Sequence, residues 1–157
     1  MPYMEEMKLK SPEDIPHTFI KAWNLKDAKM LTCIFDEDAE FINVTGLWWH
    51  DPKSIFKAHD YGLKVIFKDS KLSLRKTKVK YLSDTIAVVN ARVHLKGQTS
   101  IDGKSAKPRN TIFTFVVHQH QDGGWSCASA HNTDIVPGKE THIVDEDGEM
   151  EAVNYRN

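Results

Sequence analysis

The stretch 111–135, TIFTFVVHQHQDGGWSCASAHNTDI, decides the fold class of this chain. Residues 111–121 and 125–135 both read as strands, the first through its run of β-branched and aromatic residues. Asp122-Gly123-Gly124 lies between them, and short glycine turns of this kind join antiparallel strands. The sequence therefore predicts a β-hairpin at this point.

Two more strand-like stretches precede the hairpin, Lys71–Leu82 and Thr85–Lys96, and the turn Ser83-Asp84 joins them. Successive strands with short turns predict an antiparallel meander. One face of Thr85–Lys96 is wholly apolar and the other carries Asn90, Arg92 and His94. Either face could line the pocket, the polar one as cavity lining or the apolar one by packing on the helices, and we favour the apolar face pointing inward. Arg92 and His94 would then lie on the outer face, where a second copy of the chain could pack.

Helical patterns occupy the N-terminal half of the chain. Ser11 suits the cap of a first helix, Asp27 the cap of a second that runs to Phe35, and Asp51-Pro52 the start of a third. A strand is expected at Glu40–Thr45. Together the patterns predict an α+β fold in which three helices cover a curved, mostly antiparallel sheet and enclose a pocket.

The chain's 157 residues fit one domain. We expect residues 1–10 to form a flexible N-terminus, residues 11–137 the folded domain, and residues 138–157 an acidic, flexible tail without a core pattern. Cys33 and Cys127 lack metal or redox spacing and read as small buried side chains.

Charge and hydropathy exclude two classes of partner. Lys plus Arg number 21 and Asp plus Glu number 22, so the chain lacks the basic character of a nucleic-acid-binding protein. It also has neither a signal-peptide pattern nor an apolar run of the roughly 20 residues that span a bilayer. We therefore expect a cytoplasmic protein that binds neither nucleic acid nor membranes.

Several short strings in fixed order carry a family resemblance. They are Ala22-Trp23-Asn24, Phe35–Phe41, Asn43–Trp49, His59, Ile86–Val89, and Gly123-Gly124-Trp125 through His131-Asn132-Thr133. Over residues 12–137 the chain resembles the nuclear transport factor 2-like superfamily, within it the SnoaL-like proteins, and among these the SgcJ/EcaC family. The resemblance implies a cone-shaped pocket and a homodimer formed through the outer face of the sheet.

The resemblance also bears on chemistry, because the superfamily includes isomerases, dehydratases, cyclases and non-catalytic binders. In the ketosteroid isomerases a carboxylate base occupies the position of Asn43, and an oxyanion-binding tyrosine matches Phe19. Asparagine cannot take the proton. A steroid-isomerase mechanism is therefore not expected here.

Two histidines are the candidates for acid–base catalysis. His59 lies on the apolar side of the third helix, and strand alternation places His131 and Thr133 on the face of Trp125 and Cys127. The alternative for each histidine is a core group bonded to a neighbour, which is what a histidine on an apolar helix face, such as His59, more often is. By the same alternation Asn132 and Asp134 face outward, and a bulge would be needed to turn them inward. The expected ligand-binding residues are Asn43 as the polar group that orients a ligand, Thr133, and the apolar wall Phe19, Trp23, Phe41, Trp48 and Trp49.

His118 and His120 share one strand face at a spacing that zinc sites use. His94 is the one further ligand that could adjoin them across the sheet. With so few ligands in view, we expect no metal, and no dinucleotide fingerprint indicates a redox cofactor. Two functions stay open: a pocket that binds a small molecule and catalyses proton transfer on it, and a non-catalytic dimeric module for ligand binding or protein association.

Overall fold

A computed structural model describes residues 7–156 of the chain. Its helices are α2 (Asp14–Asn24), α3 (Ala28–Thr32) and α4 (Pro52–Lys64). Its strands are β1 (Phe35–Ile42), β2 (Trp48–Trp49), β3 (Lys71–Ser83), β4 (Ile86–Lys96), β5 (Arg109–Gln119), β6 (Trp125–Asp134), β7 (Thr141–Val144) and β8 (Met150–Val153).

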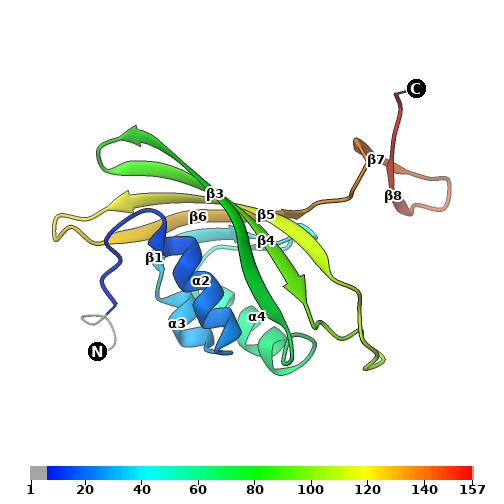
Figure 1. Ribbon diagram of the computed structural model, residues 1–157, viewed down its shortest axis with the longest axis horizontal. Coiled ribbons are helices and arrows are strands. Elements are labelled where there is room, and N and C mark those ends of the chain that lie inside the picture. Colours follow the sequence, from blue (N-terminus) through cyan, green and yellow to red (C-terminus); the bar gives the residue numbers. More distant parts are fainter. Residues whose placement is uncertain (1–6, 157) are drawn as a thin grey trace.

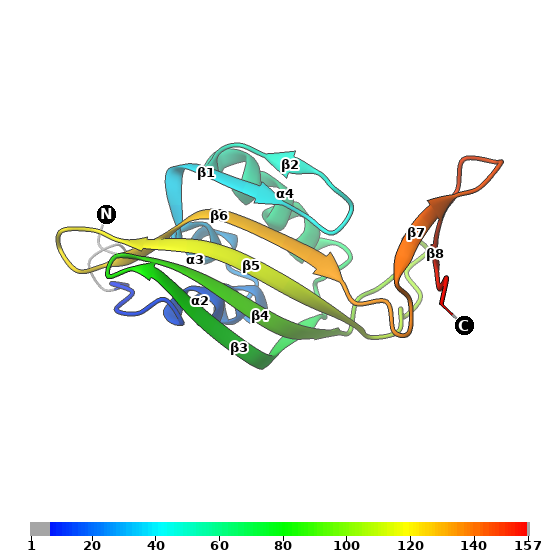
Figure 2. The ribbon, with the colours of Figure 1, turned by 90° about the horizontal axis from the view of Figure 1, so that it is seen from above.

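The first six strands form one sheet in the order β2-β1-β6-β5-β4-β3. Neighbouring strands are antiparallel except β1 and β6, which run parallel. The sheet is curved, and all three helices lie against one of its faces (Figure 1, Figure 2). The predicted α+β fold, with a mostly antiparallel sheet covered by helices from the N-terminal half, is confirmed.

The core lies between the helices and the sheet. On β4 the alternate residues from Ala87 to Leu95 are at most 4% exposed, whereas Arg92 is exposed and His94 is half-buried. The apolar face of this strand therefore points inward, as predicted. Phe19 of α2 and Phe115 of β5 meet across the two layers with ring centroids 6.0 Å apart, and burying each such ring contributes about 2–3 kcal/mol.

Two side chains at the end of α2 tie this helix to β3. Trp23 donates from Nε1 to Ser70 Oγ at 2.9 Å, and Asn24 bonds both the carbonyl and the N–H of Leu72 at 2.9 and 2.8 Å. Buried polar groups are stable only when they are bonded. These contacts therefore fix the end of α2 over the sheet, where the cavity described below begins.

The helix starts were predicted more accurately than the second helix's end. Asp27 and Asp51 cap α3 and α4 as expected, but Asp14, not Ser11, makes the bonds at the start of α2. The second helix ends at Thr32 and Phe35 already belongs to β1. The end of this short helix leaves Cys33 exposed, contrary to expectation, whereas Cys127 is buried as predicted.

Strand β6 contains a bulge. Val117 of β5 pairs with Cys127 and the adjacent Val116 pairs with Ser129, so Ala128 is an extra residue without a partner on β5. An extra residue reverses the in–out alternation beyond it. Trp125 and Cys127 are buried before the bulge, and Ala130 is buried after it.

Strands β7 and β8 pair as a separate hairpin that stands beyond the end of the sheet (Figure 1, Figure 2). The sequence did not predict this hairpin, although residues 137–151 are all exposed, in keeping with the lack of a core pattern.

At the other end, residues 1–6 of the predicted N-terminal segment lie outside the described residues, and the Leu9 carbonyl accepts from Trp125 N at 2.8 Å. The flexibility expected for both termini stays a prediction. Across residues 7–156 no helix has the length and apolar character needed to span a bilayer.

Candidate functional site

A cavity of about 340 Å³ lies between α2, α4 and the sheet. Aromatic side chains form much of its wall: Phe19, Trp23, Phe41, Trp49, Phe67 and Phe113. Its polar groups are Asn43, His59, Arg109, Thr111 and Asn132. Small-molecule sites typically have this character, with apolar walls and a few polar groups that orient the ligand.

His59 occupies the aromatic part of the cavity. Its ring centroid lies 5.2 Å from that of Phe41, 5.7 Å from that of Trp49 and 5.9 Å from that of Phe19. One turn earlier on α4, the carbonyl of Ile55 bonds His59 Nδ1 at 2.8 Å. Because a carbonyl only accepts, Nδ1 carries the hydrogen and Nε2 presents a lone pair. Nε2 is thus the nitrogen available to an occupant of the cavity.

The electrostatics of this position favour a neutral ring. Burial lowers the pKa of His59, and the hydrogen bond to the Ile55 carbonyl opposes that shift only in part. Desolvation disfavours the charged form of an imidazole among hydrocarbon rings. A neutral imidazole with a free Nε2 is the form that can take a proton from a ligand.

Asn43 also lines the cavity, but much of its hydrogen-bonding capacity serves the turn between β1 and β2. Its Oδ1 accepts from Thr45 N at 3.0 Å, Thr45 Oγ1 at 3.1 Å and Leu47 N at 2.9 Å. Asparagine favours such turns because its side chain mimics the backbone. This leaves the amide N–H groups of Asn43 for a ligand.

The β6 bulge supplies polar groups that the predicted alternation had turned outward. Asn132 lines the cavity, and within residues 7–156 its Oδ1 is the buried side-chain oxygen or nitrogen without a hydrogen-bond partner. Leaving such a group unsatisfied costs about 1–3 kcal/mol. A ligand N–H or O–H that reached Oδ1 would recover that cost.

A half-buried ion pair lies beside Asn132. Arg109, which lines the cavity, donates from Nη1 to Asp134 Oδ1 at 2.6 Å and from Nε to Gln98 Oε1 at 3.3 Å. Thr111 pairs with Asp134 across β5 and β6 and also lines the cavity. Arg109 thus brings positive charge and spare donors to the polar part of the site.

Comparisons with known proteins give the fold. No protein-family model and no curated protein matches the sequence. Among solved structures, an uncharacterized protein with a cystatin-like fold from Caulobacter vibrioides is 25% identical, with a TM-score of 0.73 over 80% of this chain and 87% of that one. An NTF-2-like protein of unknown function from Shewanella oneidensis is 19% identical, with a TM-score of 0.63 over 77% and 94% of the two chains. The fold is the nuclear transport factor 2-like cone.

A third similar structure is a ketosteroid isomerase-like protein from Erwinia carotovora atroseptica, 16% identical, with a TM-score of 0.64 over 80% of this chain and 94% of that one. These likenesses show the fold. They do not assign a family or a function, because at such identity the fold is shared far more widely than the function.

Within the cone, six of the predicted site residues line the cavity: Phe19, Trp23, Phe41, Asn43, Trp49 and His59. Three others lie elsewhere. Trp48 is 58% exposed and donates from Nε1 to Glu40 Oε2 at 2.7 Å, because successive residues of β2 face opposite ways. His131 and Thr133 are exposed on the outer face of the sheet, because the bulge reverses the alternation of β6. The prediction that they share a face with Trp125 is wrong.

The prediction from the sequence also did not include Arg109, Asn132 and Asp134 in the site. Asn132 and Asp134 were assigned to the outer face, with a bulge named as the condition for bringing them in. The run Ser126–Ala130, which lacks large side chains, was the available sign of an irregular strand.

Proposed function

We propose that the cone binds a small, largely apolar molecule carrying a carbonyl or hydroxyl group, and that His59 transfers a proton on it. The observation that carries this proposal is the bond from His59 Nδ1 to the Ile55 carbonyl, which leaves Nε2 free in an aromatic cavity. The cavity volume of about 340 Å³ falls within the range of roughly 300–1,000 Å³ found for small-molecule sites.

Each polar group would have a distinct task. His59 Nε2 would take a proton from the carbon next to a ligand carbonyl, and the Asn43 amide or Arg109 would donate to the carbonyl oxygen as charge develops there. Asn132 Oδ1 would accept from a ligand hydroxyl. This is chemistry of the isomerase, cyclase or dehydratase type, which requires neither a redox cofactor nor a metal.

The finer relationship, to the SnoaL-like proteins and the SgcJ/EcaC family, belongs to the same proposal, as does a cytoplasmic location. The strings Asn43–Trp49 and Gly123–Thr133 support the relationship. The first builds the turn that carries Asn43 and Trp49 to the cavity, and the second contains the bulge that brings in Asn132.

Two measurements test the proposal. Native mass spectrometry of the purified chain would show whether it retains a small molecule that is released on denaturation. Hydrogen–deuterium exchange of phenylacetone, followed by NMR, would show proton transfer at the carbon next to a carbonyl. We expect the protein to accelerate this exchange, and His59→Gln to reduce the acceleration by about 10²–10⁴-fold while phenylacetone still binds.

His131→Gln is the matched control, because this histidine is exposed on the opposite face of the sheet. It should leave both binding and exchange unchanged. Binding without accelerated exchange would reduce the function to that of a non-catalytic binder. No retained molecule and no phenylacetone binding would refute the proposal as a whole.

The alternative, a dimeric association module, is favoured by the uncovered face of the sheet (Figure 1). Ile112 is 38% exposed there, and the paired residues Val88 and Val116 are half-buried on the same face. We propose that two copies of the chain pack through this face. In multi-angle light scattering, Ile112→Glu should convert a dimer to a monomer, whereas Leu82→Glu at the β3–β4 turn should not. A wild-type protein that is monomeric at all concentrations would exclude the dimer.

A further inference from the structure

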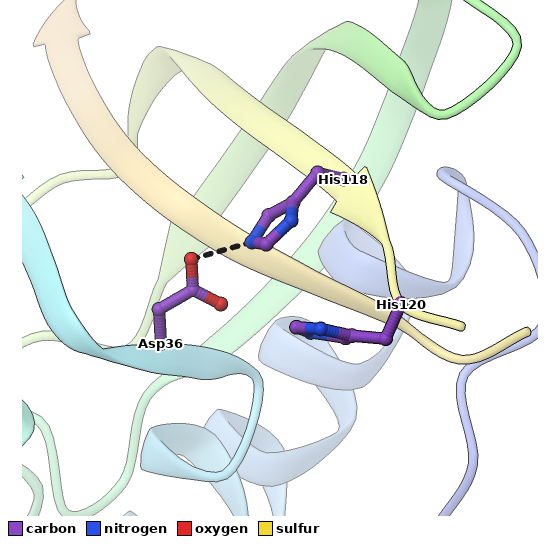
Figure 3. A group of neighbouring side chains, drawn as sticks. All are labelled: Asp36, His118 and His120. Atoms are coloured by element: carbon purple, nitrogen blue, oxygen red, sulfur yellow. Dashed lines mark hydrogen bonds and ion pairs between the residues drawn. The ribbon is translucent and has the colours of Figure 1, made fainter. Parts of the chain in front are cut away.

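A second cluster of titratable side chains lies on the other side of the sheet from the cavity. Asp36 at the start of β1, His118 near the end of β5 and His120 in the turn that follows each offer a ligand atom, and these atoms all lie within 4.8 Å of one another (Figure 3). We propose that these three side chains bind a divalent transition-metal ion, and that Zn²⁺ is the ion they suit best.

The fold holds the three side chains together through the sheet. Phe35 pairs with Cys127 and Glu40 pairs with Ser129, so the register of β1 shifts between these pairs. Asp36, which follows Phe35, meets His118 there. The turn after β5 fixes the backbone of His120, because its backbone N–H donates to the Gly124 carbonyl at 2.8 Å. The site is thus built from the start of β1, the end of β5 and the turn that follows β5.

The hydrogen bonds within the cluster define which protons a metal would replace. Because a carboxylate only accepts, His118 Nε2–H donates to Asp36 Oδ2 at 2.6 Å and the Ser126 hydroxyl donates to Asp36 Oδ1. Ser126 then accepts from His120 Nε2–H at 2.6 Å. In this arrangement the Ser126 hydroxyl hydrogen points to the Asp36 carboxylate and not to an imidazole.

A metal ion would take the place of these bridging protons. Each imidazole would move its hydrogen from Nε2 to Nδ1 and offer the Nε2 lone pair to the ion, while Asp36 supplies an oxygen. Zinc ligands lie about 2.0–2.2 Å from the ion and so about 3.4 Å from one another. The side chains must therefore shift by about an ångström, which the partly exposed His118 and exposed His120 can do.

The surroundings also favour a cation. The same depression is lined by Glu37, Asp38 and Asp122, opposed by the single basic residue Lys8. Two imidazoles and one carboxylate form a borderline donor set that suits zinc and neighbouring transition metals better than Ca²⁺ or Mg²⁺, which prefer oxygen ligands. Three protein ligands leave a fourth position for water.

The sequence indicates the pair His118 and His120, but its candidate for a third ligand, His94, lies too far away. His94 bonds Asn110 at 2.9 Å, whereas His118 faces Ile86 at the opposite end of the β4–β5 pair. Asp36 stands 82 residues from His118 in the sequence and is brought to it by the pairing of β1 with β6.

Calorimetric titration of the untagged, EDTA-treated chain with ZnCl₂ tests this site. We expect one ion per chain, and a rise in melting temperature of about 5–10 °C at a hundredfold excess of free zinc over the dissociation constant. His118→Ala and His120→Ala should each weaken binding at least tenfold, and Asp36→Asn should weaken it while nearly preserving the side chain's shape.

Two control variants sharpen the result. His142→Ala removes an exposed histidine from the tail hairpin and should bind zinc like the wild type. Cys33→Ser removes the thiol that lines the same depression and should do so too. Binding no tighter in the wild type than in the His118→Ala/His120→Ala double variant overturns the site, and loss of binding in Cys33→Ser overturns the ligand set. Circular dichroism of the exposed His120→Ala variant separates lost binding from lost folding.

This test is independent of the cavity. Thr111 at the cavity and His118 at the metal cluster lie at opposite ends of β5, about 24 Å apart at roughly 3.4 Å per residue. His59→Gln should leave zinc binding intact, and His120→Ala should leave phenylacetone exchange intact.

Discussion

His59 gives the protein a dependence on pH that one substitution can remove. Its pKa is lowered by burial, so the unfolded state binds the proton more readily than the folded state. The contribution of His59 to the free energy of unfolding is therefore complete above about pH 6.5. It falls as the pH drops from there toward the lowered pKa, by at most about 1.4 kcal/mol per pH unit. Urea unfolding between pH 7.5 and 5 should show a shallower decline for His59→Gln than for the wild type. His17→Gln, which alters an exposed histidine of α2, should decline like the wild type.

Gly97 is a position where the backbone admits no side chain. Its φ is +81°, and an added Cβ would lie 2.5 Å from the carbonyl oxygen of Asp69. The left-handed conformation alone costs a residue with a Cβ about 1–2 kcal/mol, and the clash with backbone adds to it. We expect Gly97→Ala to lower the free energy of unfolding by about 3 kcal/mol or more in urea denaturation. Gly103, with the same φ but nothing within 4 Å of its added Cβ, is the matched control and should lose only the strain. Equal losses would contradict the close approach.

At the scale of elements, the bulge in β6 determines which residues face the cavity. With one extra residue at Ala128, Ala130 is buried and His131 is exposed, the reverse of regular alternation from Trp125. Ala130→Asp should therefore destabilise the protein by about 3–5 kcal/mol through an unpaired buried charge, whereas His131→Asp should change stability by under about 1 kcal/mol. Chemical denaturation of the two variants measures this, and the opposite order would mean that β6 is regular.

The bulge also separates the features that local sequence patterns predict from those that they do not. Elements set by local patterns were predicted well: the capped starts of α3 and α4, the meander and the inward apolar face of β4. The placement of His59 followed from helical spacing alone. His131 failed because an irregularity in pairing, which no local residue preference requires, lies between it and Trp125.

Contacts between distant segments were beyond local patterns for a related reason. Asp36 meets His118 only through the pairing of whole strands. The parallel pairing of β1 with β6 joins residues near 40 to residues near 130, and the sequence contains no turn that would indicate it. The candidate metal site therefore became visible only in the folded chain.

At the scale of the whole molecule, the cone and the C-terminal hairpin form separate parts. The hairpin of β7 and β8 stands beyond the sheet (Figure 2), and residues 137–151 are all exposed. The apolar side chains Val144 and Met150 are 64% and 69% exposed. An ion pair from Arg156 Nε to Glu140 Oε2 at 2.8 Å joins two residues that both belong to the tail. Because stabilisation scales with apolar area removed from water, the hairpin contributes little to the cone.

Truncation after Pro137 tests this separation. The shortened chain should unfold within about 1 kcal/mol of the full chain, since an isolated two-stranded hairpin is marginally stable and removes little surface from water here. It should also retain the cavity function and the zinc stoichiometry, because His59 and His120 both lie in the cone. Urea unfolding and light scattering of both lengths give the comparison. A loss of several kcal/mol, or a change from dimer to monomer on truncation, would show that the hairpin packs against the cone or against a second copy in solution.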